Sequence, residues 1–387
     1  MHDLAMSDLY VPEDDLDTPA ATLESLLAEC RASRSLAPYD GEAGGSAASA
    51  APPASASFFA AVARRLRVEA YSALEVALAV LVDFREAGNG LRSQAEGWND
   101  PLGFAGYTPG EGCTVELRLE DESGKLPLPQ INAQVLANLF MAWGTQKNEA
   151  EEIADAMMGW MKRGHTYTSP VRPDYESAPI PYEAPGRPLR SYQELAAIEK
   201  AREFFYDKEG RPNENWRRFS AGVSLLDYPK PNLNSASQDV LTALGRYDPL
   251  QSRNVVDYLQ GKGDFRYSGP GYFQYDGDVG RIAGPAGDPQ GFSTSVSALR
   301  LHLTVREGRN EFRVSVVVAP PGGAKTVQAI ATRTEKRSAA SPGSPNQPAP
   351  AAPTSPGNTA GAAAKPADLK YPYTLLEIVE NPPQAGG

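Results

Sequence analysis

The sequence predicts an α+β fold in which one long helix packs on an antiparallel sheet, with a large helical segment inserted after the first strand. Three patterns lead to this prediction. Residues 58–85 repeat apolar side chains at helical spacing, residues 115–120 alternate apolar and polar side chains as a half-buried strand does, and this alternation returns only at residues 299–318. The chain between the two strand regions has helical patterns and therefore interrupts the sheet.

Residues 58–85 are predicted to form a single amphipathic helix. Their apolar side chains recur at steps of three and four, and the segment contains neither Gly nor Pro. At 1.5 Å per residue such a helix is roughly 40 Å long. The glycines at 88 and 90 follow it, as glycine commonly does at helix C-termini. We expect its apolar face to pack on the strand at Val115.

The strands come from two distant parts of the chain. Residues 115–120 alternate and are stopped by the turn residues DESG. Residues 299–306 and 312–318 alternate around the turn sequence EGRN, which predicts an antiparallel hairpin. Residues 325–333 have the pattern of a weaker third strand, and residues 371–379 regain strand character and are expected to close the sheet.

The inserted segment repeats one unit, made of a helix cap, a short helix, a turn and a second helix. The first unit covers residues 126–164, with Asn132 as the expected N-cap, and the second covers residues 231–265, with Asn234 or Ser235 as the cap. Paired helices of this kind are similar to SAM or helix-hairpin-helix modules.

These patterns divide the chain into four parts. The segment rich in small residues before the long helix cannot bury enough apolar area to offset its chain entropy, and the same holds for the Ala/Pro/Ser-rich run near the C-terminus. The predicted parts are a disordered or replaced N-terminal segment, 1–57; an α/β core, 58–120 with 296–333 and 371–380; an inserted α-helical domain, 121–295; and a disordered linker, 334–370.

Composition excludes some classes of function. The net charge is −11 and the pI is about 5.0, which argues against nucleic acid as the main partner because phosphate binding needs a basic surface. No Ser–His–acid or Cys–His order stands out, so we expect no enzyme, although a pair of catalytic carboxylates would not show in the sequence. The sequence shows neither an apolar run of membrane-spanning length nor a signal sequence at Met1.

Metal and redox candidates are few. The three histidines do not have metal-ligand spacing. Cys30 and Cys113 are either a disulfide pair or two unrelated thiols, and their number does not fix the compartment.

Calcium is the cofactor that the acidic residues could hold, because Ca²⁺ takes several oxygen ligands. Asp121 and Glu122 stand beside a glycine, where a solvated turn is the better explanation of the two acids. Asp276 and Asp278 flank Gly277 in a glycine-rich loop, but the Glu that would complete an EF-hand is missing.

Four sequence pieces in a fixed order resemble the K-type minor pseudopilins (GspK) of the bacterial type II secretion system. They cover roughly residues 62–333. The pieces are RVEAYSALEVALAVL; VELRLEDESGKLPL followed by IADAMMGWM; RPLRSYQELAAI; and PNLNSASQDVLTAL.

The resemblance implies a pilin-like core with an inserted helical domain and a non-enzymatic role in protein secretion. The chain would sit at the tip of the periplasmic pseudopilus with the I- and J-type minor pseudopilins, and its helical domain would stop further subunits adding above it. Family members are anchored in the inner membrane by an apolar helix behind a prepilin leader, whereas the residues before Phe58 are small and polar here. Family members can bind calcium, and the family's acid before the tryptophan is Gly159 in this chain.

Under this interpretation the apolar face of the long helix serves assembly with partner helices. The residues expected on that face are Phe58, Val62, Leu66, Leu74, Leu78 and Leu81. The alternative is a soluble helix-hairpin-helix-type interaction or nucleic-acid-binding protein that lacks the membrane anchor.

Overall fold

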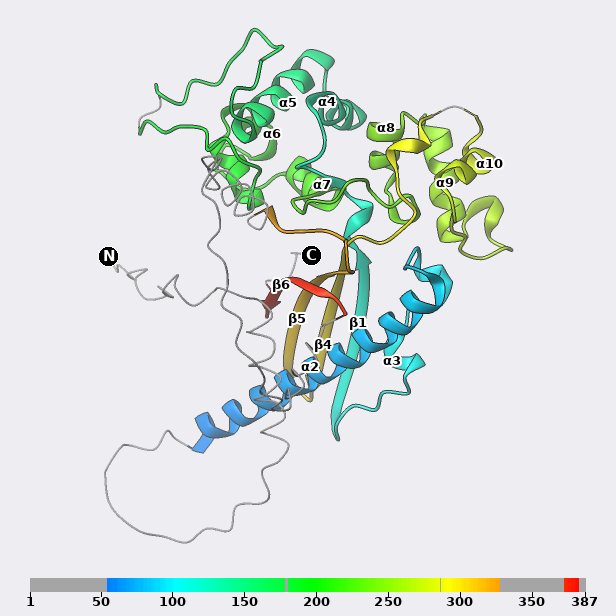
Figure 1. Ribbon diagram of the computed structural model, residues 1–387. Coiled ribbons are helices and arrows are strands. Elements are labelled where there is room, and N and C mark those ends of the chain that lie inside the picture. Colours follow the sequence, from blue (N-terminus) through cyan, green and yellow to red (C-terminus); the bar gives the residue numbers. More distant parts are fainter. Residues whose placement is uncertain (1–53, 178–179, 286, 328–371, 383–387) are drawn as a thin grey trace, which may run out of the picture. The chain divides into compact units, whose positions relative to one another are not determined.

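The computed structural model describes residues 54–177, 180–285, 287–327 and 372–382, drawn in colour in Figure 1. The chain divides into two compact units. Of the described residues, unit 1 contains 54–126, 230–285, 287–324 and 373–382, and unit 2 contains 127–177, 180–229, 325–327 and 372. Residues 230–295, which the sequence analysis placed in an inserted domain with 121–229, are therefore part of unit 1.

Unit 1 begins with the long helix α2 (Ala54–Gly88), which confirms the helix predicted over residues 58–85. It starts four residues earlier than predicted, because its Ala- and Ser-rich first turn still tolerates helical backbone. At the other end Asn89 has a left-handed backbone (φ 52°), and the Gly90 amide donates to the Arg85 carbonyl at 2.8 Å. This i to i−5 bond is the Schellman pattern that satisfies carbonyls at a helix end.

The sheet of unit 1 has four antiparallel strands in the order β1-β4-β5-β6. Its strands are β1 (Cys113–Asp121), β4 (Leu299–Glu307), β5 (Asn310–Ala319) and β6 (Thr374–Glu380). The predicted first strand, hairpin and closing strand are confirmed. The weaker strand predicted over residues 325–333 is not formed at its start, where Lys325 makes only an isolated bridge with Asp227, and residues from 328 lie outside the described part.

The register of the sheet places apolar residues opposite one another on one face. Leu303 of β4 lies between Leu117 of β1 and Val314 of β5, and Val316 of β5 pairs with Ile378 of β6. A single slip in register would turn these side chains to the opposite face, so burial of this face fixes the pairing.

Helix α2 packs along this apolar face, as the blue helix and the strands beside it show in Figure 1. This corrects the prediction that the apolar face of the helix meets partner helices. The residues of the predicted face that are buried in the core of unit 1 itself are Val62, Leu66, Leu74, Leu78 and Leu81. The side chain of Phe58 lies outside the described part. The sheet of the same chain covers the stripe, so no partner is needed to remove it from water.

The opposite face of the sheet carries charged side chains arranged in ion pairs. Arg306 of β4 lies between Glu116 of β1 at 3.0 Å and Glu311 of β5 at 2.6 Å. His302 Nε2 lies 3.5 Å from Glu120 Oε2, and hydrogen bonding with His302 holds the pKa of Glu120 well below its usual range. The sheet is thus apolar on one face and polar on the other, as its alternating sequence predicts.

The remaining helices and strands are short. Those of unit 1 are α3 (Pro101–Phe104), α8 (Gln238–Gly245), α9 (Pro249–Gln260) and α10 (Gly280–Ala283). Those of unit 2 are α4 (Ala133–Ala142), α5 (Lys147–Met161), α6 (Glu199–Phe205), α7 (Glu214–Gly222) and β3 (Val223–Ser224). Strand β2 (Leu126–Pro127) pairs with β3 in a second, two-stranded sheet.

One of the two predicted caps is correct. The Asn132 side chain accepts from the Val135 amide at 3.0 Å and caps α4. Helix α8 is capped by Ser237, whose hydroxyl accepts from the Val240 amide at 3.3 Å, and not by Asn234 or Ser235. None of the helices in the described part has both the length and the apolar character that a membrane span requires.

Candidate functional site

Two of the sequence pieces meet in unit 1 around the buried carboxylate of Asp121, at the end of β1. Asp121 accepts from the Ser123 amide at 2.9 Å, the Ser123 hydroxyl at 2.5 Å and the Asn232 side-chain amide at 2.6 Å, and also from the Ser235 hydroxyl. Burial raises the pKa of Asp121, against the lowering effect of these donors. We call Asp121, Ser123, Gly124, Asn232 and Ser235 the Asp121 junction.

Gly124 lets the two backbones of this junction approach closely. A Cβ at this position would lie 2.5 Å from the Ser235 carbonyl oxygen, which is closer than real Cβ contacts come. The Asn232 amide also donates to the Ser123 carbonyl at 2.7 Å. The backbones of residues 121–124 (DESG) and 232–235 (NLNS) are therefore in direct contact.

Asn234, the second asparagine of NLNS, is a buried internal bridge. Its side-chain amide donates to the Phe273 carbonyl at 3.1 Å and to the Thr294 carbonyl at 3.2 Å, and its side-chain oxygen accepts from the Phe273 amide at 2.7 Å. These bonds occupy the side chain that was expected to cap α8.

The candidate calcium ligands are occupied by groups of the protein. Glu122 is 3% exposed, and its carboxylate lies 2.9 Å from Lys125 Nζ and 3.2 Å from Arg300 Nε. Asp276 accepts from the Gly277 amide at 2.8 Å, and Asp278 faces Arg281 at 3.7 Å. Across the described residues, His, Cys, Asp and Glu side chains do not gather in groups of three or more that could hold a metal ion. Calcium binding therefore stays a prediction.

The pairing of the two cysteines also stays a prediction. Cys113 begins β1 and is half-buried, and Cys30 lies outside the described residues.

Unit 2 contains a second buried carboxylate, Asp155, in the IADA sequence of α5. It accepts from His165 Nε2 at 2.8 Å, from the amide and hydroxyl of Thr168 at 2.6 and 2.9 Å, and from the Ser169 amide at 2.7 Å. Burial acts to raise the pKa of Asp155, but the donors from Ser169, His165 and Thr168 outweigh it and hold the pKa below its usual value. These hydrogen bonds hold residues 165–169, which follow α5, against the helix.

Gly159 lies on the same helix, where the resemblance leads one to expect an acid. A Cβ at this position would clash with the hydroxyl oxygen of Tyr167. The ring of Tyr167 thus fills the space that a side chain at 159 would need.

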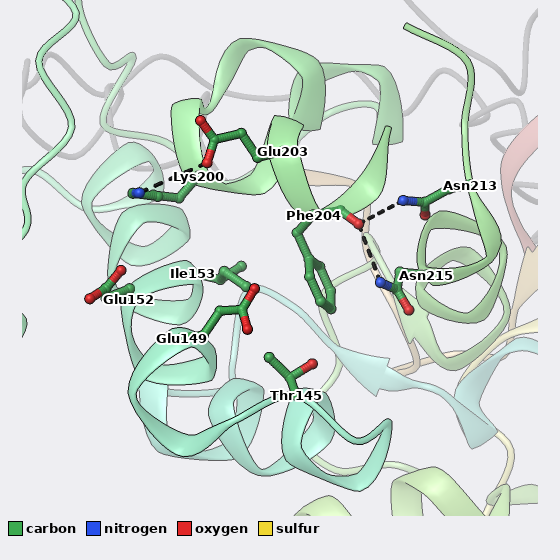
Figure 2. Close-up of a pocket in the computed structure, with 9 residues that line it drawn as sticks. All are labelled: Thr145, Glu149, Glu152, Ile153, Lys200, Glu203, Phe204, Asn213 and Asn215. Atoms are coloured by element: carbon green, nitrogen blue, oxygen red, sulfur yellow. Dashed lines mark hydrogen bonds and ion pairs between the residues drawn. The ribbon is translucent and has the colours of Figure 1, made fainter. Parts of the chain in front are cut away.

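A cavity of about 370 Å³ lies in unit 2 beside α5 and α6 (Figure 2). We call it the α5–α6 cavity. Its lining residues are Thr145, Glu149, Glu152, Ile153, Lys200, Glu203, Phe204, Asn213 and Asn215. The sequence analysis missed it because its walls come from three stretches of the chain that only folding brings together.

The polar groups of the cavity are only partly paired with one another. Lys200 Nζ lies 3.8 Å from Glu203 Oε2, and the side-chain amides of Asn213 and Asn215 donate to the Phe204 carbonyl at 2.8 and 3.3 Å. Glu149 and Glu152 form no ion pair with any described residue. The cavity therefore has more hydrogen-bond acceptors than donors.

Comparison with protein families decides between the two sequence-based interpretations. Residues 118–208 match the family model of type II secretion system (T2SS), protein K. The match confirms the family that the sequence pieces indicated, and it favours a minor pseudopilin over the helix-hairpin-helix alternative. The matched segment begins in β1 and includes Asp121, Gly124 and Asp155.

One solved structure is also similar. It is a chain of "The Crystal Structure of the GspK-GspI-GspJ complex from enterotoxigenic Escherichia coli Type 2 Secretion System". The two sequences are 14% identical, the TM-score is 0.46, and the alignment covers 68% of this chain and 94% of that chain. A comparison with curated proteins finds no significant match.

Proposed function

We propose that this chain is a minor pseudopilin of the K type that caps the tip of a type II secretion pseudopilus with the I- and J-type minor pseudopilins. The observation that carries the proposal is the K-type match over residues 118–208. A long helix laid on a four-stranded antiparallel sheet in unit 1 agrees with a pilin-like core. Its role is assembly and shape in the periplasm, with the inner-membrane anchor that the family implies.

We place the assembly surface on the side of α2 that faces away from the sheet, because the apolar side of the helix is buried in the core of unit 1. Residues that are exposed or half-buried there recur at steps of three and four, so they lie along one stripe of the helix. We call Arg64, Val68, Ser72, Glu75 and Ala79 the outer α2 stripe. Arg64 and Glu75 form no ion pair among the described residues, so their charges are available to a partner helix.

Substitutions on this stripe test the proposal. Arginine at both Ser72 and Ala79 should leave the fold intact, because these positions lie outside the core, and should weaken capture of the I- and J-type pseudopilins at least about tenfold by steric and charge conflict. The measurement is co-purification of the three proteins from the same organism, with circular dichroism as the check of folding.

Ala63→Arg is the matched control, since Ala63 is exposed on α2 but points away from the stripe. It should capture both partners normally. Normal capture by the Ser72→Arg, Ala79→Arg variant would reject this stripe as the assembly surface. Failure of the wild-type chain to capture either partner would reject the proposed function itself.

A further inference from the structure

We propose that the α5–α6 cavity binds an arginine side chain presented by a protein partner. This proposal goes beyond the pseudopilin assignment and does not require it. Its volume of about 370 Å³ falls in the range of small-ligand pockets, about 300–1,000 Å³. Figure 2 shows Thr145, Glu149 and Phe204 facing the same open space.

The charge of the cavity selects a cation. Three carboxylates and one ammonium line it, so its formal net charge is −2. Only Glu203 has an internal partner, Lys200 at 3.8 Å, while Glu149 and Glu152 form no ion pair among the described residues. Lys200 is itself an example of the proposed ligand, because it places an organic cation against one of the three carboxylates, that of Glu203.

The hydrogen bonding of the cavity selects a ligand with several donors. The side-chain amides of Asn213 and Asn215 are already used by the Phe204 carbonyl. The carboxylates of Glu149 and Glu152 are acceptors only, and they form no ion pair among the described residues. A guanidinium carries five N–H donors and no acceptor, which complements such a surface.

The aromatic wall favours guanidinium over a metal ion or a simple ammonium. Figure 2 shows the Phe204 ring directed toward the space between α5 and the α4–α5 turn, with Ile153 nearby. An arginine can lay its planar group on such a ring. The same unit already contains this arrangement, because the Arg218 guanidinium lies 4.9 Å from the centre of the Trp143 ring. No described group of acidic side chains in the chain is suited to a metal.

A titration with two matched probes tests the ligand class. Nα-acetyl-arginine amide is added to the full chain and followed by NMR at the side-chain amide of Asn215 and the methyl group of Thr145. Nα-acetyl-citrulline amide, which has the same shape without the charge, is the control. We expect saturable shifts with the arginine probe at millimolar concentration and none with citrulline. Equal binding of both probes, or no saturable shift with arginine, would overturn the proposal.

Variants of the lining residues test the site. Glu149→Gln with Glu152→Gln should weaken binding of the arginine probe by about fivefold or more, because two partly exposed ion pairs are lost. Glu151→Gln is the control on the same helix, since Glu151 pairs with Lys147 and does not line the cavity. An equal loss in both variants would show a general charge effect and reject the site.

A variant that should increase the affinity for the arginine probe provides a second test. Lys200→Met removes the cation that pairs with Glu203 and makes the charge of the cavity more negative, so the arginine probe should bind more tightly. Lys147→Met, outside the cavity, should leave the affinity unchanged. Unchanged or weaker binding in the Lys200→Met variant would contradict a cavity that selects cations by charge.

Discussion

Two buried aspartates, one in each unit, hold loops in place by accepting several hydrogen bonds at once. Asp121 joins β1 to the NLNS segment, and Asp155 joins α5 to residues 165–169. Their pKa values move in opposite directions, because burial dominates at Asp121 whereas the donors dominate at Asp155. Both belong to the sequence pieces that indicated the family, so these aspartates have a structural reason to be where they are.

The lowered pKa of Asp155 leads to a pH-dependent prediction. Because its folded pKa is below the usual 3.8, ionised Asp155 stabilises the fold above that pH, and this stability is lost as the pH falls through the folded pKa. Asp155→Asn should therefore lower the free energy of unfolding at pH 7 by about 1–3 kcal/mol, and the difference from wild type should shrink below about pH 4.

Urea unfolding at several pH values measures this difference. Asp83→Asn is the control, because Asp83 is exposed on α2 and forms no ion pair with a described residue. It should match wild type at neutral pH. A stability difference for Asp155→Asn that stays constant into strong acid would contradict the role assigned to its charge.

At the scale of elements, the spacing of apolar residues predicted whether a segment is a helix or a strand better than it predicted where the segment begins and ends. The 3.6-residue period of α2 and the alternation of β1, β4 and β5 were correctly interpreted, because burial on one face imposes each period. The cap of α8 was misplaced by a few residues. Asn234 and Ser235 are good capping residues, but Phe273 and Asp121, which are distant in sequence, take their hydrogen bonds.

The contact between DESG and NLNS gives a prediction at this scale. Gly124→Ala should lower the unfolding midpoint by an amount equivalent to about 1–3 kcal/mol, because its methyl group would press on the Ser235 carbonyl and neither backbone can move freely. Gly277→Ala is the control, since no atom lies within 4 Å of a Cβ there and its backbone needs no left-handed angle. Equal midpoints for the two variants would refute the close contact.

At the scale of the whole molecule, unit 1 builds one core from parts of the chain that are far apart. Leu78 of α2 packs with Leu303 of β4, Val316 of β5 and Tyr373 before β6 in the same cluster. Burial raises the pKa of Tyr373 to about 12, and its hydroxyl donates to the Leu81 carbonyl at 3.2 Å. The apolar stripe that the sequence analysis assigned to partners is thus part of the fold.

A charge in this core should prevent folding of unit 1. Leu78→Asp places a carboxylate at a position that is 2% exposed and should destabilise the unit by more than about 4 kcal/mol. Ala79→Asp, one residue further and exposed, should stay within about 0.5 kcal/mol of wild type. Thermal unfolding followed by circular dichroism compares the two variants. A stably folded Leu78→Asp protein would restore the idea that this face is free for partners.

The sequence by itself predicted the long helix and the four strands of the sheet in unit 1 and indicated the family, because periodic burial and ordered motifs are written along the chain. Only the tertiary structure decided which groups each of these surfaces contacts. It placed the apolar stripe of α2 in the core, paired Glu122 with Lys125 and Arg300, and assembled the α5–α6 cavity from three separate stretches. The physical reason is that a side chain's partner depends on distance in space, and residues far apart in sequence become neighbours only when the core forms.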